Sequence, residues 1–256
     1  MKTYLQEVGA IAFRILIELV RTRRSLQMWI IFPTLMLLLL GLIYSGRNDL
    51  SVSFDRTAPG VLIGAAFFFS CLGGPIALIV GERERHTLRR LLLSPIKPAS
   101  YFSGIVLAYL AIAAMQTFIV YGISFLFGGK FHGSIVYGLV IICLSVFSFV
   151  GLGFFFGARF TKRTEDVIGP VAAFGVPLLI LGCTFFPVHL LPPYLLIAAQ
   201  FDPILHMNES LKAVSAHGAT FHDIQEHLFF LVCFAVLSLF LGIWSYKKML
   251  SLEKRG

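Results

Sequence analysis

Residues 134–158 read SIVYGLVIICLSVFSFVGLGFFFGA, a long run without a charged residue. A helix of about 20 apolar residues crosses the roughly 30 Å hydrocarbon core of a bilayer. Similar runs recur along the 256-residue chain, of which 57% is hydrophobic and 13% charged, with a mean hydropathy of +0.86. Backbone amides cannot stay unpaired in lipid, and unbroken apolar runs exclude the alternating pattern of a barrel. The sequence therefore predicts an all-α integral membrane protein.

Six segments have the length and hydropathy of a transmembrane helix. They lie near residues 28–45, 61–81, 101–127, 134–158, 167–186 and 228–246. Residues 1–27 are predicted to form an amphipathic interfacial helix, because Val8, Ile11, Ile15 and Leu19 recur at helical spacing. Residues 187–227 begin with an apolar stretch that prolines interrupt, which predicts short external re-entrant helices. Residues 1–256 are thus expected to form a single transmembrane domain.

The distribution of basic residues predicts the orientation. Of the 21 Lys and Arg residues, 17 lie in the two terminal segments and in the loops that follow the second and fourth spans. The other four are Arg47, Arg56, Lys130 and Lys212. Cytoplasmic loops carry an excess of Lys and Arg, so both termini are predicted to be cytoplasmic. The formal net charge of +8 then faces anionic membrane lipids and cytosolic partners, and no nucleic-acid partner is needed to explain it.

The predicted spans offer no ionisable chemistry, since none of them contains Asp, Glu, Lys, Arg or His. Ion-coupled and proton-coupled carriers generally need such groups at membrane depth. The chain also lacks a GxxxxGK[ST] phosphate loop, an HExxH zinc helix and a GxSxG nucleophile elbow. We therefore predict no catalytic, cofactor-binding or metal-binding residues, and a chain that is not an enzyme.

Histidines gather in the external region, which holds five of the seven in the chain. They are His189, His206, His217, His222 and His227. Two interpretations are open, a zinc or pH-sensing site and ordinary solvated loop residues. The five-residue spacing from His217 to His222 and again to His227 is poor for ligands on one helical face, which favours solvated residues.

The loop of residues 82–98, between the second and third spans, is organised like a short helix rather than a simple connector. Residues 82–85 are all charged, Leu88, Leu91 and Leu92 form an apolar stripe at helical spacing, and Pro95 stops the helix. An amphipathic helix of this kind either anchors in the membrane interface or fits a groove on a partner protein.

This loop, ERERHTLRRLLLSP, resembles that of type-2 ATP-binding-cassette (ABC) transporter permeases, which typically read like ERExGTLExLLxTPV. The matching residues are Glu82, Arg83, Glu84, Thr87, Leu88, Leu91, Leu92, Ser94 and Pro95. A second match lies in the Pro-rich stretch after the fifth span, at Pro177, Phe186, Pro187, Leu191, Pro192, Pro193, Asp202 and Pro203. The chain departs from the family at His86, Arg89 and Ile105, where Gly, an acidic residue and a basic residue are common.

The resemblance implies a small six-span permease of a bacterial plasma (inner) membrane that exports a drug-like compound, a lipid or a lipid-linked glycan. It implies two copies of a cytosolic ABC ATPase that bind ATP and Mg²⁺, with no cofactor on this chain. A second copy of the permease, as a homodimer or a heterodimer, would complete the assembly. The expected ATPase-coupling residues are Glu82, Arg83, Glu84, Arg85, His86, Thr87, Leu88, Leu91 and Leu92.

A substrate route between the two copies is predicted to involve Phe67, Phe68, Phe69, Gln116, Phe154 and Phe155. An uncharged aromatic surface suits a hydrophobic or amphipathic substrate, whereas packing inside the protein or against lipid is the alternative for these residues. Three other functions stay open. They are polysaccharide export by a permease of the same class, a stand-alone channel or secondary carrier, and, with the least support, a membrane enzyme.

Overall fold

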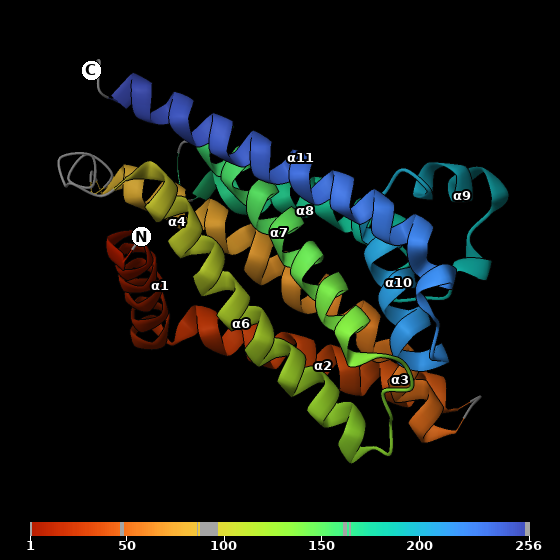
Figure 1. Cartoon of the computed structure of the whole chain (residues 1–256). Coiled ribbons are helices and arrows are strands. Elements are labelled where there is room, and N and C mark those ends of the chain that lie inside the picture. Colours follow the sequence, from red (N-terminus) through yellow and green to blue (C-terminus); the bar gives the residue numbers. More distant parts are fainter. Residues whose placement is uncertain are drawn as a thin grey trace.

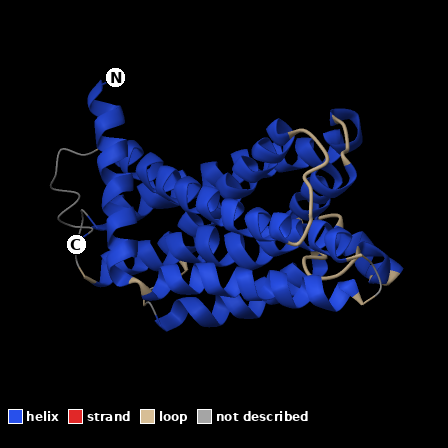
Figure 2. Cartoon of the chain, turned by 90° about the horizontal axis from the view of Figure 1, so that it is seen from below, coloured by secondary structure: helices blue, strands red, loops and turns tan. Residues whose placement is uncertain are grey.

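The computed structural model describes residues 2–46, 49–85, 87, 97–160, 163 and 165–253. Every regular element within these ranges is a helix, which confirms the prediction of an all-α membrane protein (Figure 2). The elements are α1 (Lys2–Thr22), α2 (Arg24–Ser45), α3 (Leu50–Gly60), η1 (Val61–Leu72), α4 (Gly73–Glu84), α6 (Pro98–Leu126), α7 (Ile135–Arg159), α8 (Glu165–Leu181), η2 (Val188–Leu190), α9 (Pro193–Ala199), α10 (Pro203–His217) and α11 (Phe221–Glu253).

Five helical segments in these ranges are long and apolar enough to cross a bilayer. They are Arg24–Ser45, Leu50–Glu84, Pro98–Leu126, Ile135–Arg159 and Phe221–Met249. The fifth predicted span, residues 167–186, corresponds to α8, whose 17 residues extend about 25 Å. Helix α1 begins at the same end of the bundle at which α11 ends (Figure 1). A chain with both termini at one end passes along the bundle an even number of times. Counting α8 as a pass raises the total from five to six, and the count of six spans stays a prediction.

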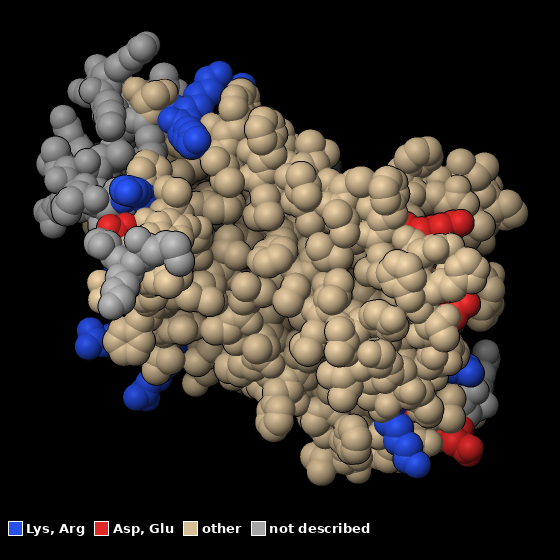
Figure 3. Space-filling model, viewed as in Figure 1, with Lys and Arg blue, Asp and Glu red and all other residues tan. Residues whose placement is uncertain are grey.

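We call the end of the bundle that carries both termini the proximal end, and the opposite end, formed by α3, α9 and α10, the distal end (Figure 1). Charged side chains on the visible face gather at these two ends and leave the middle bare (Figure 3). This is the distribution expected when the middle lies in hydrocarbon, because charges at membrane depth are costly.

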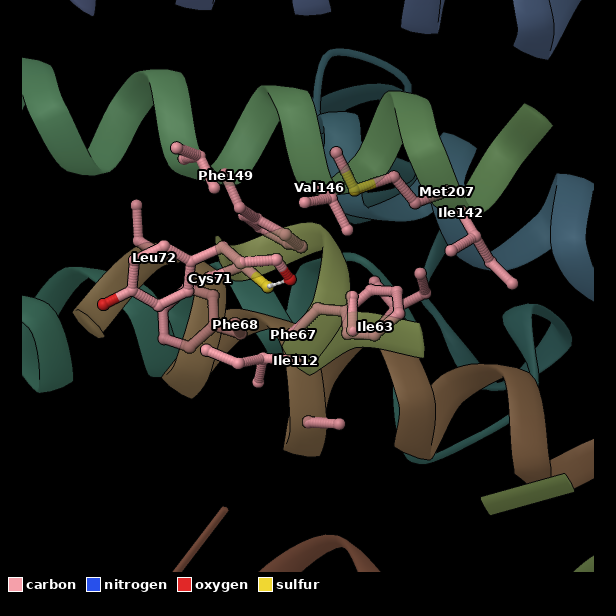
Figure 4. Packing of buried hydrophobic residues seen from close by; sticks show 14 of the residues in the cluster. Ile63, Phe67, Phe68, Cys71, Leu72, Ile112, Ile142, Val146, Phe149 and Met207 are labelled. Atoms are coloured by element: carbon pink, nitrogen blue, oxygen red, sulfur yellow. Dashed lines mark hydrogen bonds between the residues drawn. The ribbon is translucent and has the colours of Figure 1, made fainter. Parts of the chain in front are cut away.

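The segment Leu50–Glu84 forms the centre of the bundle. In its most apolar stretch 78% of the residues are buried, against 17% for α2, which lies at the periphery of the single chain. Phe67 and Phe68 of this segment point toward α7, where Phe149 meets Phe68 edge-on with ring centroids 6.0 Å apart (Figure 4). Aromatic pairs favour this arrangement. The core of the protein thus lies between the second span and α7.

The second span differs from its prediction at residues 61–81. The helix begins at Leu50 and ends at Glu84, and it is π-helical from Val61 to Leu72. A hydropathy search does not detect the first part of this helix, Leu50–Gly60, because Asp55 and Arg56 lower its mean hydropathy. Phe54 in the same part is nevertheless fully buried. Periodicity and hydropathy therefore detect the apolar middle of this helix and miss its polar first turns.

Helix α1 is amphipathic, as residues 1–27 were predicted to be, but it ends at Thr22 and packs on protein. Ile11 and Ile15 are buried against the bundle, and the hydroxyl of Tyr4 lies 2.8 Å from that of Ser103 in α6. Gly104 of α6 allows the close approach, because a Cβ at this position would lie 2.6 Å from Ile11. The helix is thus part of the packed fold.

Residues 187–227 contain the short helices η2, α9 and α10 at the distal end, and their external, re-entrant placement stays a prediction. Pro203 takes the first position of α10, and Asp202 caps the helix by accepting a hydrogen bond from the Ile204 amide (2.9 Å). Gly218 ends the helix in the left-handed conformation, with φ of 65°. Standard start and stop signals therefore set the limits of α10.

Candidate coupling site around Glu82

Glu82 lies in the last turn of α4, at the proximal end, and its side chain is only 7% exposed. One carboxylate oxygen accepts a hydrogen bond from the Arg14 guanidinium of α1, and the other accepts one from the Tyr101 hydroxyl of α6. The ring of Tyr101 in turn stacks on Tyr246 of α11, with centroids 5.4 Å apart. One carboxylate therefore connects α4 directly to two helices and indirectly to a third.

Glu82 needs the ion pair with Arg14 more than Arg14 does. Arg14 is 46% exposed and can be hydrated, whereas the buried Glu82 carboxylate relies on its protein donors. Burial opposes the charge on Arg14, but the attraction and hydrogen bond of Glu82, with the attraction of Tyr101 and Glu18, together outweigh this effect and raise the Arg14 pKa. The guanidinium therefore stays charged at any physiological pH.

Arg83, the next residue, connects α4 to the other side of the bundle. Its guanidinium donates to the carbonyl of Ala158 near the C-terminal end of α7 (3.1 Å) and lies 2.7 Å from the Met249 sulfur of α11. Carbonyls in the last turn of a helix have no helical donor, and a cation there also complements the helix dipole. Glu82 and Arg83 together thus hold the end of α4 to four other helices.

Beyond these two residues the charged run reaches the surface. Glu84 and Arg85 are exposed, and Arg85 lies 3.5 Å from Glu18 of α1 in an exposed ion pair of the kind that contributes little stability. The Thr87 hydroxyl donates to the Glu82 carbonyl (3.1 Å), so the chain stays close to the helix end.

The predicted coupling set therefore divides in two. Glu82 and Arg83 turn into the protein, while Glu84 and Arg85 face outward. His86, Leu88, Leu91 and Leu92 lie outside the described residues, and contact of the set with an ATPase stays a prediction. Sequence reasoning did not identify Arg14, Tyr101 or Tyr246 as parts of this site. The only signal was that Arg14 belongs to an amphipathic helix.

The predicted route residues lie mostly inside the single chain. Phe67, Phe68 and Phe154 are buried, and Phe154 packs on Phe102 with centroids 4.5 Å apart. Phe69 and Phe155 are partly exposed. A route between two copies stays a prediction, and in it Phe69 and Phe155 are the more accessible phenylalanines.

Gln116, predicted as a residue of the substrate route, has a structural role between helices of the same chain. Its Nε2 donates to the Trp29 carbonyl of α2 (3.0 Å), and its Oε1 accepts from Ser70 (2.9 Å). Trp29 is four residues before Pro33, which has no amide hydrogen to offer this carbonyl. In lipid an unpaired carbonyl is costly, so Gln116 supplies the donor that Pro33 lacks.

Two of the histidines in residues 187–227 are paired rather than solvated. His206 of α10 and His227 of α11 bring their Nδ1 atoms within 2.8 Å, and His206 Nε2 donates to the Gln200 carbonyl (2.9 Å). Since Nε2 of a neutral His206 carries its proton, its Nδ1 accepts from His227. In the described part of the chain no three His, Cys, Asp or Glu residues cluster as metal ligands would.

Comparison with known proteins yields one family. Residues 6–215 match the ABC-2 type transporter family, a range that includes Arg14, Glu82 and Tyr101 as well as most of α10. A comparison with curated proteins gives no match. The matched range covers most of the chain, and the five long apolar helices agree with a multi-pass membrane protein. The chain therefore belongs to the ABC-2 type transporter family, whose members are the membrane permease components of ABC transporters.

Proposed function

We propose that the chain exports a hydrophobic or amphipathic compound across a bacterial plasma membrane, powered by two copies of a cytosolic ABC ATPase. The family supports a transport subunit that associates with an ABC ATPase. The excess of Lys and Arg supports a cytoplasmic proximal end, where such an ATPase would dock. A second copy of the permease would provide the other wall of the route.

The contacts of Glu82 and Arg83 support this function most directly. A partner that moves the segment after α4 acts on a helix end held by the Arg14–Glu82 ion pair, the Tyr101 hydroxyl and the Arg83–Ala158 hydrogen bond. Rigid helices joined by buried polar contacts shift together rather than one at a time. ATPase closure would therefore move α1, α4, α6 and α7 as one unit.

The proposed substrate class follows from what the spans contain. In the five long apolar segments the middle is uncharged, and the accessible route candidates Phe69 and Phe155 are aromatic. Such a surface binds apolar groups and offers little to a strongly polar solute. Drug-like compounds, lipids and lipid-linked glycans all carry the apolar part that this surface would contact.

The proposal can be tested by purifying the tagged chain from its native membranes in mild detergent. We expect an ABC ATPase in stoichiometric amount, together with ATP hydrolysis by the complex. Leu91→Asp should reduce the retained ATPase at least several-fold, because it places a charge on the apolar stripe. Lys130→Ala is the control and should retain the wild-type amount, because this exposed residue lies beside Asp55 of α3, at the distal end.

Two results would contradict the proposal. One is a chain that purifies from native membranes without an ABC ATPase and transports without ATP. The other is unchanged ATPase retention and unchanged transport in Leu91→Asp and Glu84→Ala.

A further inference from the structure

A cavity of about 320 Å³ opens at the distal end, far from the coupling site. Its walls come from α2, α3, the turn before η2 and α10. Among the residues that line it are Arg56, Asn208, Glu209 and Lys212, which place charged and polar groups in an otherwise mostly apolar wall. The coupling mechanism proposed above uses none of these residues.

The charges in this cavity favour an anion. Arg56 is exposed and, among the described residues, forms neither an ion pair nor a hydrogen bond. Lys212 lies 3.4 Å from Glu209, so one of the two cations is already balanced by a carboxylate. His189 and His217 also line the cavity and add positive charge when protonated. One guanidinium is thus left to bind a phosphate or carboxylate, which its planar geometry suits.

Asn208 has a side-chain oxygen that needs a hydrogen-bond donor from a ligand. Its side chain is buried, and its Nδ2 donates to the Gly182 carbonyl (2.8 Å) and to the Thr184 hydroxyl oxygen (3.0 Å). A carbonyl can only accept, so this orientation of the amide is fixed. The Oδ1 atom is left buried without a donor. A buried acceptor without a partner is costly, and a ligand hydroxyl group would satisfy it.

The wall of the cavity is preformed. The Tyr44 hydroxyl of α2 donates to the Phe185 carbonyl (2.8 Å) and holds the turn before η2 against α2. Gly60 and Gly64 let the same turn lie directly on the second span, because a Cβ at either position would lie 2.0 Å from Thr184. A site whose walls are already packed loses little entropy when a ligand binds.

The surroundings indicate where the rest of the ligand lies. Leu40 of α2 lines the cavity, and Leu39, Leu42 and Ile43 on the same helix are exposed. On a single copy in a membrane, this face of α2 is open to acyl chains. A molecule with its headgroup in the cavity could therefore keep its apolar tail in the bilayer.

We infer that this distal cavity binds the headgroup of an anionic membrane lipid, with the phosphate on Arg56 and a headgroup hydroxyl on Asn208. The lipid tail lies along α2. Binding requires neither ATP nor an ATPase, so the inference stands or falls independently of the proposed export function.

The test measures lipid binding to the purified chain in detergent, by native mass spectrometry and by the shift in thermal unfolding. Phosphatidylglycerol carries both a phosphate and free hydroxyls and should bind most tightly. Phosphatidylmethanol, which is anionic but has no hydroxyl, should bind several-fold more weakly. Phosphatidylcholine, which is zwitterionic, should bind most weakly of the three.

Arg56→Gln should weaken phosphatidylglycerol binding about tenfold and bring it near that of phosphatidylcholine, because one charged hydrogen bond is lost. Arg56 is exposed, so the variant should fold. Lys130→Gln removes another exposed cation at the same end, outside the cavity, and should bind within twofold of the wild type.

Unchanged binding in Arg56→Gln, or equal binding of phosphatidylcholine, would overturn the site. Equal binding of phosphatidylmethanol would overturn the hydroxyl contact to Asn208. If glycerol phosphate in free solution bound as tightly as phosphatidylglycerol, the cavity would bind a soluble phosphate and the lipid assignment would be wrong.

Discussion

Arg14 and Glu82 are 68 positions apart in the sequence and form a salt bridge at the proximal end of the bundle. The contact joins an amphipathic helix before the first span to the last turn of the second span. Because Glu82 also accepts from Tyr101, the pair holds α1, α4 and α6 together at the place where an ATPase is proposed to dock.

Arg14→Met should destabilise the protein more than Glu82→Gln does. Loss of Arg14 leaves a buried carboxylate with one fewer donor, whereas loss of the Glu82 charge leaves a guanidinium that water can reach. We expect losses of about 1–3 kcal/mol for the first change and less for the second, read as thermal unfolding midpoints in detergent. Arg21→Met, an exposed position on the same helix, should change little. Equal losses in the two site variants would disprove the asymmetry.

The Gln116–Trp29 hydrogen bond predicts that one substitution can compensate for the loss of another. Gln116→Leu should destabilise the protein by about 1–2 kcal/mol, because the Trp29 carbonyl then lacks a donor. Pro33→Ala restores an amide hydrogen at the position that would normally bond this carbonyl. The double variant should therefore recover much of the stability lost in Gln116→Leu, which a double-mutant cycle measures. Additive effects would mean that Gln116 does not compensate for Pro33.

Two glycines of α6 offer a matched pair for the packing of α1. Gly104→Ala places a Cβ 2.6 Å from Ile11, so α1 must move away from the bundle. Gly122→Ala on the same helix meets nothing within 4 Å and should be neutral or stabilising by up to about 1 kcal/mol. Limited proteolysis within residues 2–22 should accelerate in the first variant only. Equal rates in both variants would show that α1 is not held at Gly104.

Asp202 predicts a pH dependence of stability. Burial raises the pKa of this carboxyl from 3.8 to about 6, and its Oδ2 has no hydrogen-bond donor. The folded state therefore holds the proton more tightly than the unfolded state. Its contribution to stability is greatest below about pH 4 and declines as the pH rises through 6, by roughly 3 kcal/mol in all.

Asp202→Asn keeps the cap on α10 and removes the ionisation, so it should abolish this decline and be more stable than the wild type at pH 7.5. Asp202→Ala should lack the decline but be less stable than Asp202→Asn at every pH, since it also loses the cap. Unfolding midpoints between pH 4 and 8 measure both effects. A wild-type decline that persists in Asp202→Asn would assign it to another group.

Much of the fold was predictable because hydropathy is a local property. The apolar run at residues 134–158 gave α7 almost to the residue, and the prolines of residues 187–227 indicated short helices in place of a span. The early start of the second span at Leu50 was missed, because the burial of its polar first turns depends on neighbouring helices.

The coupling site was predictable only in part. The charged run at residues 82–85 could be identified from sequence, but its partners Arg14 and Tyr101 come from other helices and depend on packing. Away from this site, the Gln116–Trp29 hydrogen bond could have been predicted in part. Gln116 is a polar residue in an apolar span and needs a hydrogen-bond partner there. Pro33 leaves a carbonyl unpaired in another span, and the two signals together suggest the observed bond.

Site-specific photocrosslinking at Leu91 tests the central claim that an ABC ATPase docks on the segment after Glu82. A photoreactive residue at this position should crosslink to the ATPase in native membranes, with a yield that changes when ATP is bound. The same residue at Ile135, which is exposed at the distal start of α7, should give no such product. If Leu91 gave no crosslink while the ATPase remained bound to the chain, or if Ile135 crosslinked equally well, the docking claim would be contradicted.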